Sequence, residues 1–157
     1  MPRKYNSTAK FMQPDPRFES MLVAKFINSL MWDGKKSTAR KILYDALDLL
    51  TAKIPGEEPL EAFSTAINNI KPMVEVRSRR VGGATLQVPH EIRRERQQAL
   101  AFRWVINASR SKKGKPMARR LAEELYDAYN KQGAAYTTRE NTHKMAEANK
   151  AYAHFAW

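Results

Sequence analysis

Arginines placed around a double glycine are the residues in this sequence best suited to a chemical task, the binding of a polyanion. They belong to the stretch VEVRSRRVGGATLQVPHEIRRER, residues 74–96. Gly82 and Gly83 predict a two-residue hairpin turn, because both tolerate the positive φ that such turns require. The turn sets a strand register with three pairs: Val81 with Ala84, Arg79 with Leu86, and Arg77 with Val88. Neither face of this ribbon is cleanly apolar, so we expect its outer half to project and lie against nucleic acid.

A second group of basic residues, Lys35, Lys36, Arg40 and Lys41, opens the second predicted helix. Lys35 and Lys36 would lie at the positive end of the helix dipole, where lysine is mildly unfavourable for the helix itself. Two lysines beside the free backbone N–H groups of a helix start can, however, form a phosphate site. The alternative is a flexible turn whose lysines face water, and the sequence leaves both interpretations open.

The third group of basic residues lies between positions 103 and 120, and no Asp or Glu interrupts it. Its members are Arg103, Arg110, Lys112, Lys113, Lys115, Arg119 and Arg120. The ordinary interpretation of such a run is a solvated helix face. A solvated face usually mixes signs, because Glu–Lys pairs stabilise a helix and like charges do not. Positive charges without opposing acids therefore predict an external anion that balances them.

The overall charge favours the same interpretation. The chain has 157 residues and a net charge of +12, which opposes compaction and is most easily explained by a polyanionic partner. Nucleic acid is the first candidate and an anionic membrane surface is the second. No apolar run approaches the roughly 20 residues of a membrane span, and no apolar segment follows the basic N-terminus. The absence of cysteine excludes disulfides and fits a reducing compartment, so we expect a soluble cytoplasmic protein.

Residues that could support catalysis or bind metal are sparse. The sequence has no glycine-rich phosphate loop, no Ser/His/Asp pattern and no paired carboxylates away from predicted helix starts. His90, His143 and His154 are scattered, with only Glu140 and Glu147 near His143. We therefore predict no enzymatic activity, no small-molecule substrate, no metal and no cofactor. His143 and His154 are expected to form hydrogen bonds on a helix surface or to contact RNA.

The elements that must position these groups are mostly helical, because apolar residues recur at helical spacing, as in Leu22, Phe26 and Leu30. The first predicted helix carries this stripe and is broken after Met31. A second runs from about Lys35 to before Pro55, and a third from near Pro59 to before Pro72. The fourth spans about 94–110, the fifth carries Met117, Leu121, Leu125 and Ala128, and the sixth spans about 138–154. The fold class is therefore mainly α: a six-helix, bundle-like domain with one protruding β-hairpin between helices three and four. We predict a single domain over 1–157, with a flexible basic arm at 1–17 and a hairpin arm at 73–90.

Finer expectations concern the ends and faces of these helices. The inner face of the fourth helix is predicted to carry Ala99, Leu100, Trp104 and Ala108. Gly133 is expected to stop the fifth helix, and Thr137 with Glu140 has the capping-box spacing that would open the sixth. Leu47 and Phe63 lie on apolar faces of the second and third helices, so both are expected in the core.

Three long, ungapped stretches of the sequence resemble one known family. They are PDPRFESMLVAKFINSLMWDGKKSTARKI, KPMVEVRSRRVGGATLQVPHEI and HKMAEANKAYAHF. All three are similar to the signature of small-subunit ribosomal protein seven in its bacterial form, and the resemblance covers essentially the whole chain from Pro14 onward. The family fold, six helices with an extended β-hairpin, agrees with the elements predicted above.

The resemblance implies a primary binder of small-subunit ribosomal RNA that nucleates folding of the 3′ domain, the head of the subunit. It implies a position at the subunit interface near the decoding region, where the hairpin approaches exit-site transfer RNA. Its protein neighbours would resemble ribosomal proteins nine and eleven of the same subunit. Carried over by motif and character, the RNA-facing residues would be Arg3, Lys4, Lys10, Lys35, Lys36, Arg77, Arg79, Arg80, Arg94, Arg96, Lys112, Lys113, Lys115 and Arg119.

Two other function classes compete with this one. A nucleoid-type architectural protein that binds duplex DNA with its arms would explain the charge and the hairpin equally well on composition alone. Such proteins usually build a compact dimer around strands, whereas six helices suffice for a monomer. An RNA-modifying enzyme is the third interpretation, and the sequence contains no cofactor motif for it.

Overall fold

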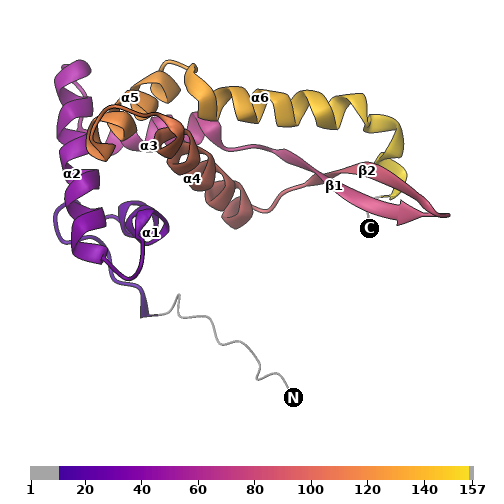
Figure 1. The fold of residues 1–157 in the computed structure, drawn as a ribbon, viewed down its shortest axis with the longest axis horizontal. Coiled ribbons are helices and arrows are strands. Elements are labelled where there is room, and N and C mark those ends of the chain that lie inside the picture. The colour runs from indigo at the N-terminus through magenta and orange to yellow at the C-terminus, as the bar shows by residue number, and fades with distance from the viewer. Residues whose placement is uncertain (1–10, 156–157) are drawn as a thin grey trace.

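The computed structural model describes residues 11–155, which form six α-helices and one antiparallel hairpin (Figure 1). In chain order these elements are α1 (Met21–Leu30), α2 (Lys36–Lys53), α3 (Pro59–Ile70), β1 (Val74–Val81), β2 (Ala84–Glu91), α4 (Arg94–Ser111), α5 (Met117–Tyr129), α6 (Gly133–Ala148) and the 3-10 helix η2 (Lys150–Phe155). The predicted fold class, mainly α with one hairpin between the third and fourth helices, is confirmed.

Helices α1 to α5 supply most of the hydrophobic core. Three phenylalanines meet within it: the Phe26 ring centroid lies 5.3 Å from that of Phe63 and 5.1 Å from that of Phe102, both in edge-to-face geometry. Leu47 and Phe63 are fully buried, as the periodicity of their helices predicts. Because helices of this length are marginal on their own in water, burial of these apolar faces is what stabilises them.

Helix α4 buries a wider surface than the predicted one, and only one of the four predicted residues is fully buried. Leu100 is buried, but Ala99 is exposed, and Trp104 and Ala108 are only partly buried. The buried residues of α4 are Leu100, Ala101, Phe102, Val105, Ile106 and Ser109. The prediction failed because α4 contacts α1, α3, α5 and α6, so its buried surface is wider than the single stripe of a surface helix.

Helix α6 begins at Gly133 instead of residue 138, so Gly133 starts this helix and the predicted capping box is wrong. The Thr137 hydroxyl donates to the Gly133 carbonyl, 2.9 Å away, inside the helix. The buried carboxylate of Glu124 replaces the capping box by accepting the Ala135 backbone N–H at 2.8 Å. Gly133 has φ +91°, and an added Cβ would lie 2.9 Å from the Asp127 Cβ, so this close approach of α5 and α6 requires glycine. The helix ends at Ala148, and η2 replaces the rest of its predicted length.

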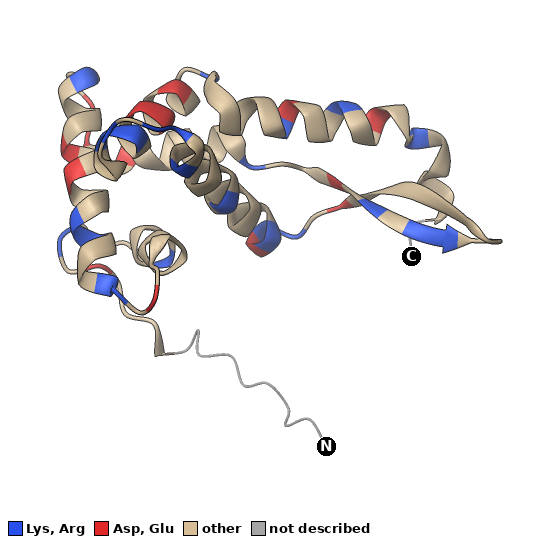
Figure 2. Ribbon diagram, viewed as in Figure 1, with Lys and Arg blue, Asp and Glu red and all other residues tan. Residues whose placement is uncertain are grey.

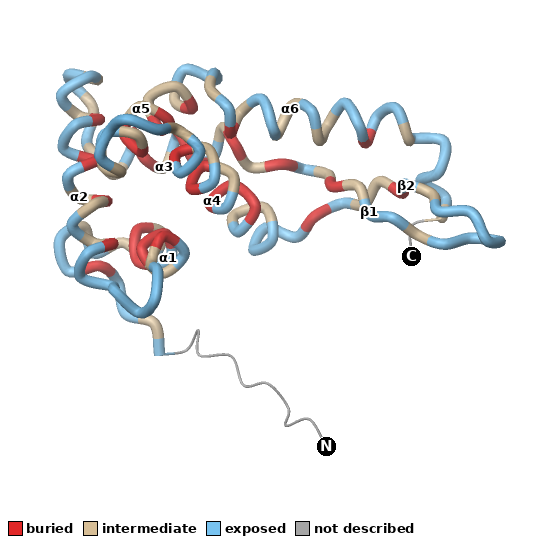
Figure 3. The backbone as a smooth tube through the Cα atoms, viewed as in Figure 1, coloured by how far each residue is buried: buried red, intermediate tan, exposed pale blue. Residues whose placement is uncertain are grey.

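The hairpin extends away from the helical core beside α6 (Figure 1). Its register is the predicted one: Val81 lies opposite Ala84, Arg79 opposite Leu86, and Arg77 opposite Val88. Gly82 and Gly83 both have positive φ, as the predicted turn requires. Val88 is buried near the root, whereas residues around the turn are exposed (Figure 3). Because η2 packs against β2, the C-terminal segment backs part of the hairpin, which does not stand entirely free.

Residues 11–17 are the described part of the predicted flexible arm, and their end is held against α2. Asp15 is 3% exposed, and its carboxylate accepts the Tyr44 hydroxyl at 2.8 Å and the Arg17 backbone N–H at 3.1 Å. Arg17 Nη2 lies 2.6 Å from Asp48 Oδ1 on α2. These contacts hold Asp15–Arg17 against α2, because a buried carboxylate needs its hydrogen-bond partners, and the flexibility of the arm stays a prediction.

Candidate nucleic-acid interface

Glu75, at the root of the hairpin, organises two of the predicted RNA-facing arginines. Its Oε1 lies 2.5 Å from Arg77 Nη2, and its Oε2 lies 3.3 Å from Arg96 Nη2 on α4. Burial alone would raise the pKa of Glu75, but the two guanidinium groups outweigh burial and hold the pKa below its ordinary value. The charged carboxylate therefore ties β1 to α4. The Arg77 side chain is still 58% exposed and keeps donors for a second anion.

The outer half of the hairpin carries positive charge only. Figure 2 shows Lys and Arg on the strand next to the turn, with acidic residues confined to the root. Arg79 Nη1 donates to the Phe155 carbonyl at 2.8 Å, which fixes this arginine against η2. Arg80 is exposed and has no hydrogen bond or ion pair within residues 11–155. This half of the hairpin thus presents a tethered arginine next to one whose donors are available.

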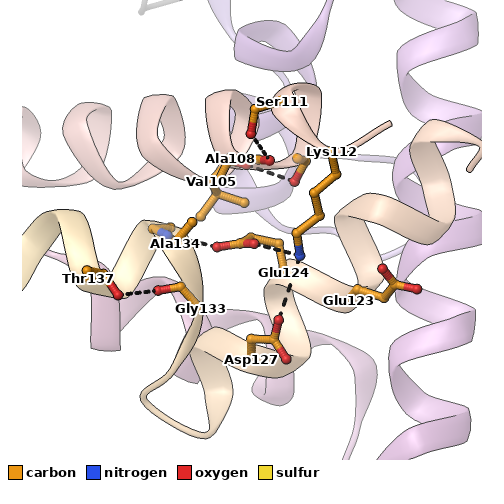
Figure 4. Close-up of polar contacts among 12 residues, drawn as sticks. Val105, Ala108, Ser111, Lys112, Glu123, Glu124, Asp127, Gly133, Ala134 and Thr137 are labelled. Atoms are coloured by element: carbon orange, nitrogen blue, oxygen red, sulfur yellow. Dashed lines mark hydrogen bonds and ion pairs between the residues drawn. The ribbon is translucent and has the colours of Figure 1, made fainter. Parts of the chain in front are cut away.

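The loop between α4 and α5 is less uniformly basic in space than in sequence. Lys112 Nζ lies 2.8 Å from Glu124 Oε2 and 3.7 Å from Asp127 Oδ2 (Figure 4). Burial lowers the pKa of Lys112, but the hydrogen bond and charge of Glu124 outweigh it, and the net pKa is raised. Lys115 Nζ lies 2.5 Å from Glu123 Oε1. The prediction that this cluster lacks opposing acids is therefore wrong for Lys112 and Lys115, because α5 brings its own acidic residues to the loop.

Other members of the same cluster divide into structural and available cations. Arg120, on α5, donates to the backbone carbonyls of Arg110 and Lys112. It therefore links α5 to the C-terminal end of α4. Three members are exposed and have no partner among the described residues: Arg103, Lys113 and Arg119. Three cations in this region are therefore available to bind an external anion, whereas the sequence suggested that all seven members of the cluster would be.

The start of α2 has the geometry predicted for an anion site. Lys35 is the N-cap residue and Lys36 the first helical residue, and the first turn contains no Asp or Glu. Asp33 and Gly34 reverse the chain just before it, with φ of 48° and 74°. The side chains of both lysines are exposed and lack partners within the described part of the chain. The N–H groups of Lys35 and Lys36 already donate to the Trp32 and Gly34 carbonyls, so the two lysine side chains and the following N–H groups of the first turn are what suit a phosphate group here.

Of the predicted RNA-facing residues not yet discussed, only Arg94 lies among the described residues. Arg94 is exposed at the first residue of α4 and has no partner in the range 11–155. Arg3, Lys4 and Lys10 lie outside the described residues. The structure does not gather the predicted residues into one cluster. It distributes them over the hairpin with the start of α4, the α4–α5 loop, and the start of α2 (Figure 2).

Trp32 is a surface residue that the predictions did not single out. Its side chain is exposed, and the guanidinium carbon of Arg110 lies 5.0 Å from its ring centroid. A signal for it is present in the sequence. Trp32 falls outside the apolar stripe that includes Leu30, and it directly precedes the turn at Asp33. Both features indicate a residue outside the hydrophobic core.

His143 joins the hairpin root to α6, which agrees with the expected helix-surface hydrogen bond. Its Nε2 accepts the Met73 backbone N–H at 3.1 Å. Burial lowers the pKa of His143, and the charge of Arg139 lowers it further, while Glu140 acts weakly in the opposite direction. Only the neutral imidazole can accept this hydrogen bond, since both ring nitrogens of the protonated form are donors.

Acidification is expected to loosen this contact. The pKa of His143 is lower in the folded state than the ordinary value of about 6.5, so the unfolded chain binds more protons as pH falls through that region. Stability from this group is therefore present at higher pH and decreases as pH drops through and below about 6.5. Hydrogen-exchange protection of the Met73 amide should therefore decrease as the pH falls below about 6.5, and His143→Ala should remove this pH dependence.

The Ile92 amide is the internal control for that experiment, because it donates to the Met73 carbonyl at 3.2 Å without involving a titrating group. A Met73 protection factor that stays constant over this pH range would show that the imidazole does not hold the hairpin root. A loss of protection at both Met73 and Ile92 when the His143→Ala protein is acidified would give the same conclusion, since that fraying would not depend on the imidazole.

No group of three His, Asp or Glu side chains within 11–155 is placed to hold a metal ion. None of the described helices is both long and apolar enough to cross a bilayer. A cavity of about 460 Å³ beside the start of α2 is lined by Lys36 and Arg40 with one carboxylate, Asp15, which again suits an anion.

Comparison with known proteins adds a consistent result. A sequence model of the family described as "Ribosomal protein S7p/S5e" matches residues 2–150, which include all six α-helices and the hairpin. Proteins named "Small ribosomal subunit protein uS7" are similar over nearly the full chain. The relative from Rhodopirellula baltica is 59% identical over 144 residues, 91% of this chain and 92% of its own length. Those from a Nitratiruptor species and from Pelagibacter ubique are each 55% identical, over 99% and 100% of both chains.

Proposed function

Because this chain belongs to the ribosomal protein S7p/S5e family and is a protein of the small ribosomal subunit, we propose that it is a primary binder of small-subunit ribosomal RNA in the cytoplasmic ribosome. In this role it nucleates folding of the 3′ domain into the head of the subunit. The observation that carries the proposal is the placement of exposed cations without acidic partners at three separate places on one small fold. Separate cationic sites suit an RNA whose strands must be brought together, since phosphate contacts fix position and register.

The cations differ in the part that they play. Those without partners among residues 11–155 are assigned the phosphate contacts: Lys35, Lys36, Arg80, Arg94, Lys113 and Arg119. Those with acidic partners primarily hold the surface in shape: Arg77, Arg96, Lys112 and Lys115. Arg79, tethered to the C-terminal segment, orients the hairpin. Arg3, Lys4 and Lys10 add positive charge from the N-terminal segment.

The hairpin and α6 suggest where the protein acts in the assembled ribosome. They extend together from the core, and the outer hairpin carries arginines and no acidic residue (Figure 2). A strand rises about 3.3 Å per residue, so such an arm reaches well beyond the body. We propose that it reaches the subunit interface near the decoding region and contacts exit-site transfer RNA. Small-subunit proteins nine and eleven are the proposed protein neighbours.

A nucleoid-type architectural DNA-binding protein is the alternative. It is disfavoured because the core closes within one chain, among helices, and needs no partner strands to complete it. Competition between structured small-subunit ribosomal RNA and duplex DNA of equal length distinguishes the two functions. We expect the RNA to displace the DNA at equal nucleotide concentration, and a preference for duplex DNA would overturn the proposal.

Shortening the hairpin should affect the ribosome more than the fold. The residues from Arg80 to Thr85 are all exposed, so replacing them with an Asn-Gly turn that joins Arg79 to Leu86 should change stability by less than about 0.5 kcal/mol. Binding to ribosomal RNA should weaken only by the lost Arg80 contact, whereas retention of exit-site transfer RNA by reconstituted subunits should decrease.

Arg80→Ala is the matched control, because it removes the charge and keeps the full length of the arm. The full-length arm should retain more transfer RNA than the shortened one. Collapse of the fold in the shortened protein, measured by thermal melting, would show that the tip is required for packing and would contradict the role proposed for it.

A further inference from the structure

Trp32 is the most exposed tryptophan among the described residues, and its surroundings distinguish it from an ordinary surface side chain. It is 64% exposed, and it belongs neither to the core nor to the partly buried residues packed against it. Single exposed apolar residues are common and need no explanation by themselves. The inference therefore depends on how this ring is held and on what lies around it.

The indole of Trp32 is held from one side. The guanidinium carbon of Arg110, on α4, lies 5.0 Å from the ring centroid. Arg110 Nη2 donates to the Leu30 carbonyl at the end of α1 at 3.1 Å, and this bond fixes the cation that covers the ring. The backbone is fixed as well, because the Lys35 N–H donates to the Trp32 carbonyl at 2.9 Å. Since the guanidinium lies over one face, the exposed area of the indole includes the opposite face.

The surroundings of this ring are basic and polar. Lys35 and Lys36 follow it in the chain, and Asp33 is the one acidic residue of the turn. Next to Arg110 lies a cavity of about 310 Å³, whose polar lining includes Ser29, Arg103 and Asn107. These side chains can donate to phosphate oxygens or to the edge of a base.

We propose that Trp32, held by Arg110, is a stacking platform for one unpaired base of the ribosomal RNA; this inference rests on the proposed function. Single-stranded RNA is recognised by bases that stack on aromatic rings and arginine planes, next to cations that hold the backbone. Trp32 supplies the ring, and Lys35 and Lys36 supply the adjacent phosphate contacts. The cavity on the Arg110 side offers further donors from Arg103 and Asn107. An RNA base is favoured over a protein partner because lysine is depleted at protein interfaces.

Substitution of the ring separates stacking from charge. Trp32→Ala should lower affinity for a 3′-domain RNA fragment by roughly 5- to 160-fold, the range that loss of one stacked base produces. Trp32→Phe should keep most of the affinity. The salt dependence of binding should not change in either variant, because no phosphate contact is lost, whereas Lys36→Ala should reduce its slope by about one.

Leu49→Ala is the control for loss of an exposed apolar side chain. Leu49 is 38% exposed on α2, next to Asp48, and its truncation should leave RNA affinity unchanged. Thermal melting should be the same for Trp32→Ala and the parent, since Trp32 lies outside the core. The chain contains three tryptophans, so a Trp104→Phe, Trp157→Phe protein that melts like the parent isolates the fluorescence of Trp32. RNA should quench that fluorescence and protect it from acrylamide.

Several outcomes would overturn the inference, each recognisable by itself. Parent-like affinity of Trp32→Ala, or a loss in Trp32→Phe as large as in Trp32→Ala, would exclude stacking. A reduced salt slope in Trp32→Ala would show that the ring acts only by placing cations. Unchanged RNA affinity with loss of a neighbouring ribosomal protein from reconstituted subunits would assign Trp32 to a protein contact. Failure of the parent chain to bind the RNA at all would refute the proposed function, and the stacking site with it.

Discussion

Raising the salt concentration from about 50 to about 200 mM is expected to weaken binding of this chain to small-subunit ribosomal RNA by about 10³- to 10⁵-fold. That range corresponds to roughly six to ten phosphate contacts, each of which releases counterions. The described cations without side-chain partners are the residues proposed to make these contacts, among them Lys35, Lys36, Arg80, Lys113 and Arg119. A filter-binding titration at several salt concentrations measures the slope of log affinity against log salt directly.

Two lysines of equal charge provide a matched comparison within that titration. Lys36 has no partner within residues 11–155, whereas Lys115 Nζ lies 2.5 Å from Glu123 Oε1. Lys36→Ala should reduce the salt slope by about one, and Lys115→Ala should reduce it less, because its charge is already balanced in the free protein. A nearly flat salt response of the parent, or equal slopes for all three proteins, would contradict the electrostatic basis of binding.

Phe63→Ala is expected to destabilise the fold by about 3–5 kcal/mol, a large fraction of the stability of a domain of this size. The Phe63 side chain is fully buried, and its ring meets Phe26, which in turn meets Phe102 of α4. Truncation would leave a cavity where α1 and α3 meet, and a close-packed core fills such a cavity only partly. Urea denaturation of the free protein measures the change in the free energy of unfolding.

Leu49→Ala serves again as the control, since an exposed apolar side chain should contribute within about 0.5 kcal/mol. RNA binding by the Phe63→Ala protein should fall in proportion to its unfolded fraction and recover at lower temperature. A Phe63→Ala protein with the same urea midpoint as the parent would show that the ring does not support the core.

The fold could be predicted from the sequence where a signal is local. Gly82 and Gly83 determine the turn, and the turn then determines every strand pair observed in the hairpin. Phe63 lies in the core because its helix has one narrow apolar face. The buried face of α4 could not be predicted in this way, because that helix is surrounded by others and buries residues such as Phe102 that lie off any single stripe.

The candidate interface was harder to predict than the fold, because charged side chains form ion pairs with residues on other helices. Lys112 and Lys115 lie in an uninterrupted basic stretch of the sequence, yet both form ion pairs with acidic residues of α5. The same buried Glu124 that holds Lys112 also satisfies the first turn of α6, which made the predicted capping role of Thr137 unnecessary. Pairing of this kind depends on tertiary packing, which no local spacing rule contains.

Footprinting of the free protein on intact small-subunit ribosomal RNA tests the proposed role most directly. Backbone protection should be confined to the 3′ domain, and it should appear without any other ribosomal protein, as expected of a primary binder. Protection should be weaker with the Lys35→Ala, Lys36→Ala protein, because both exposed lysines flank the start of α2. Protection spread evenly over all domains of the RNA, or confined to a domain outside the head, would contradict the role proposed here.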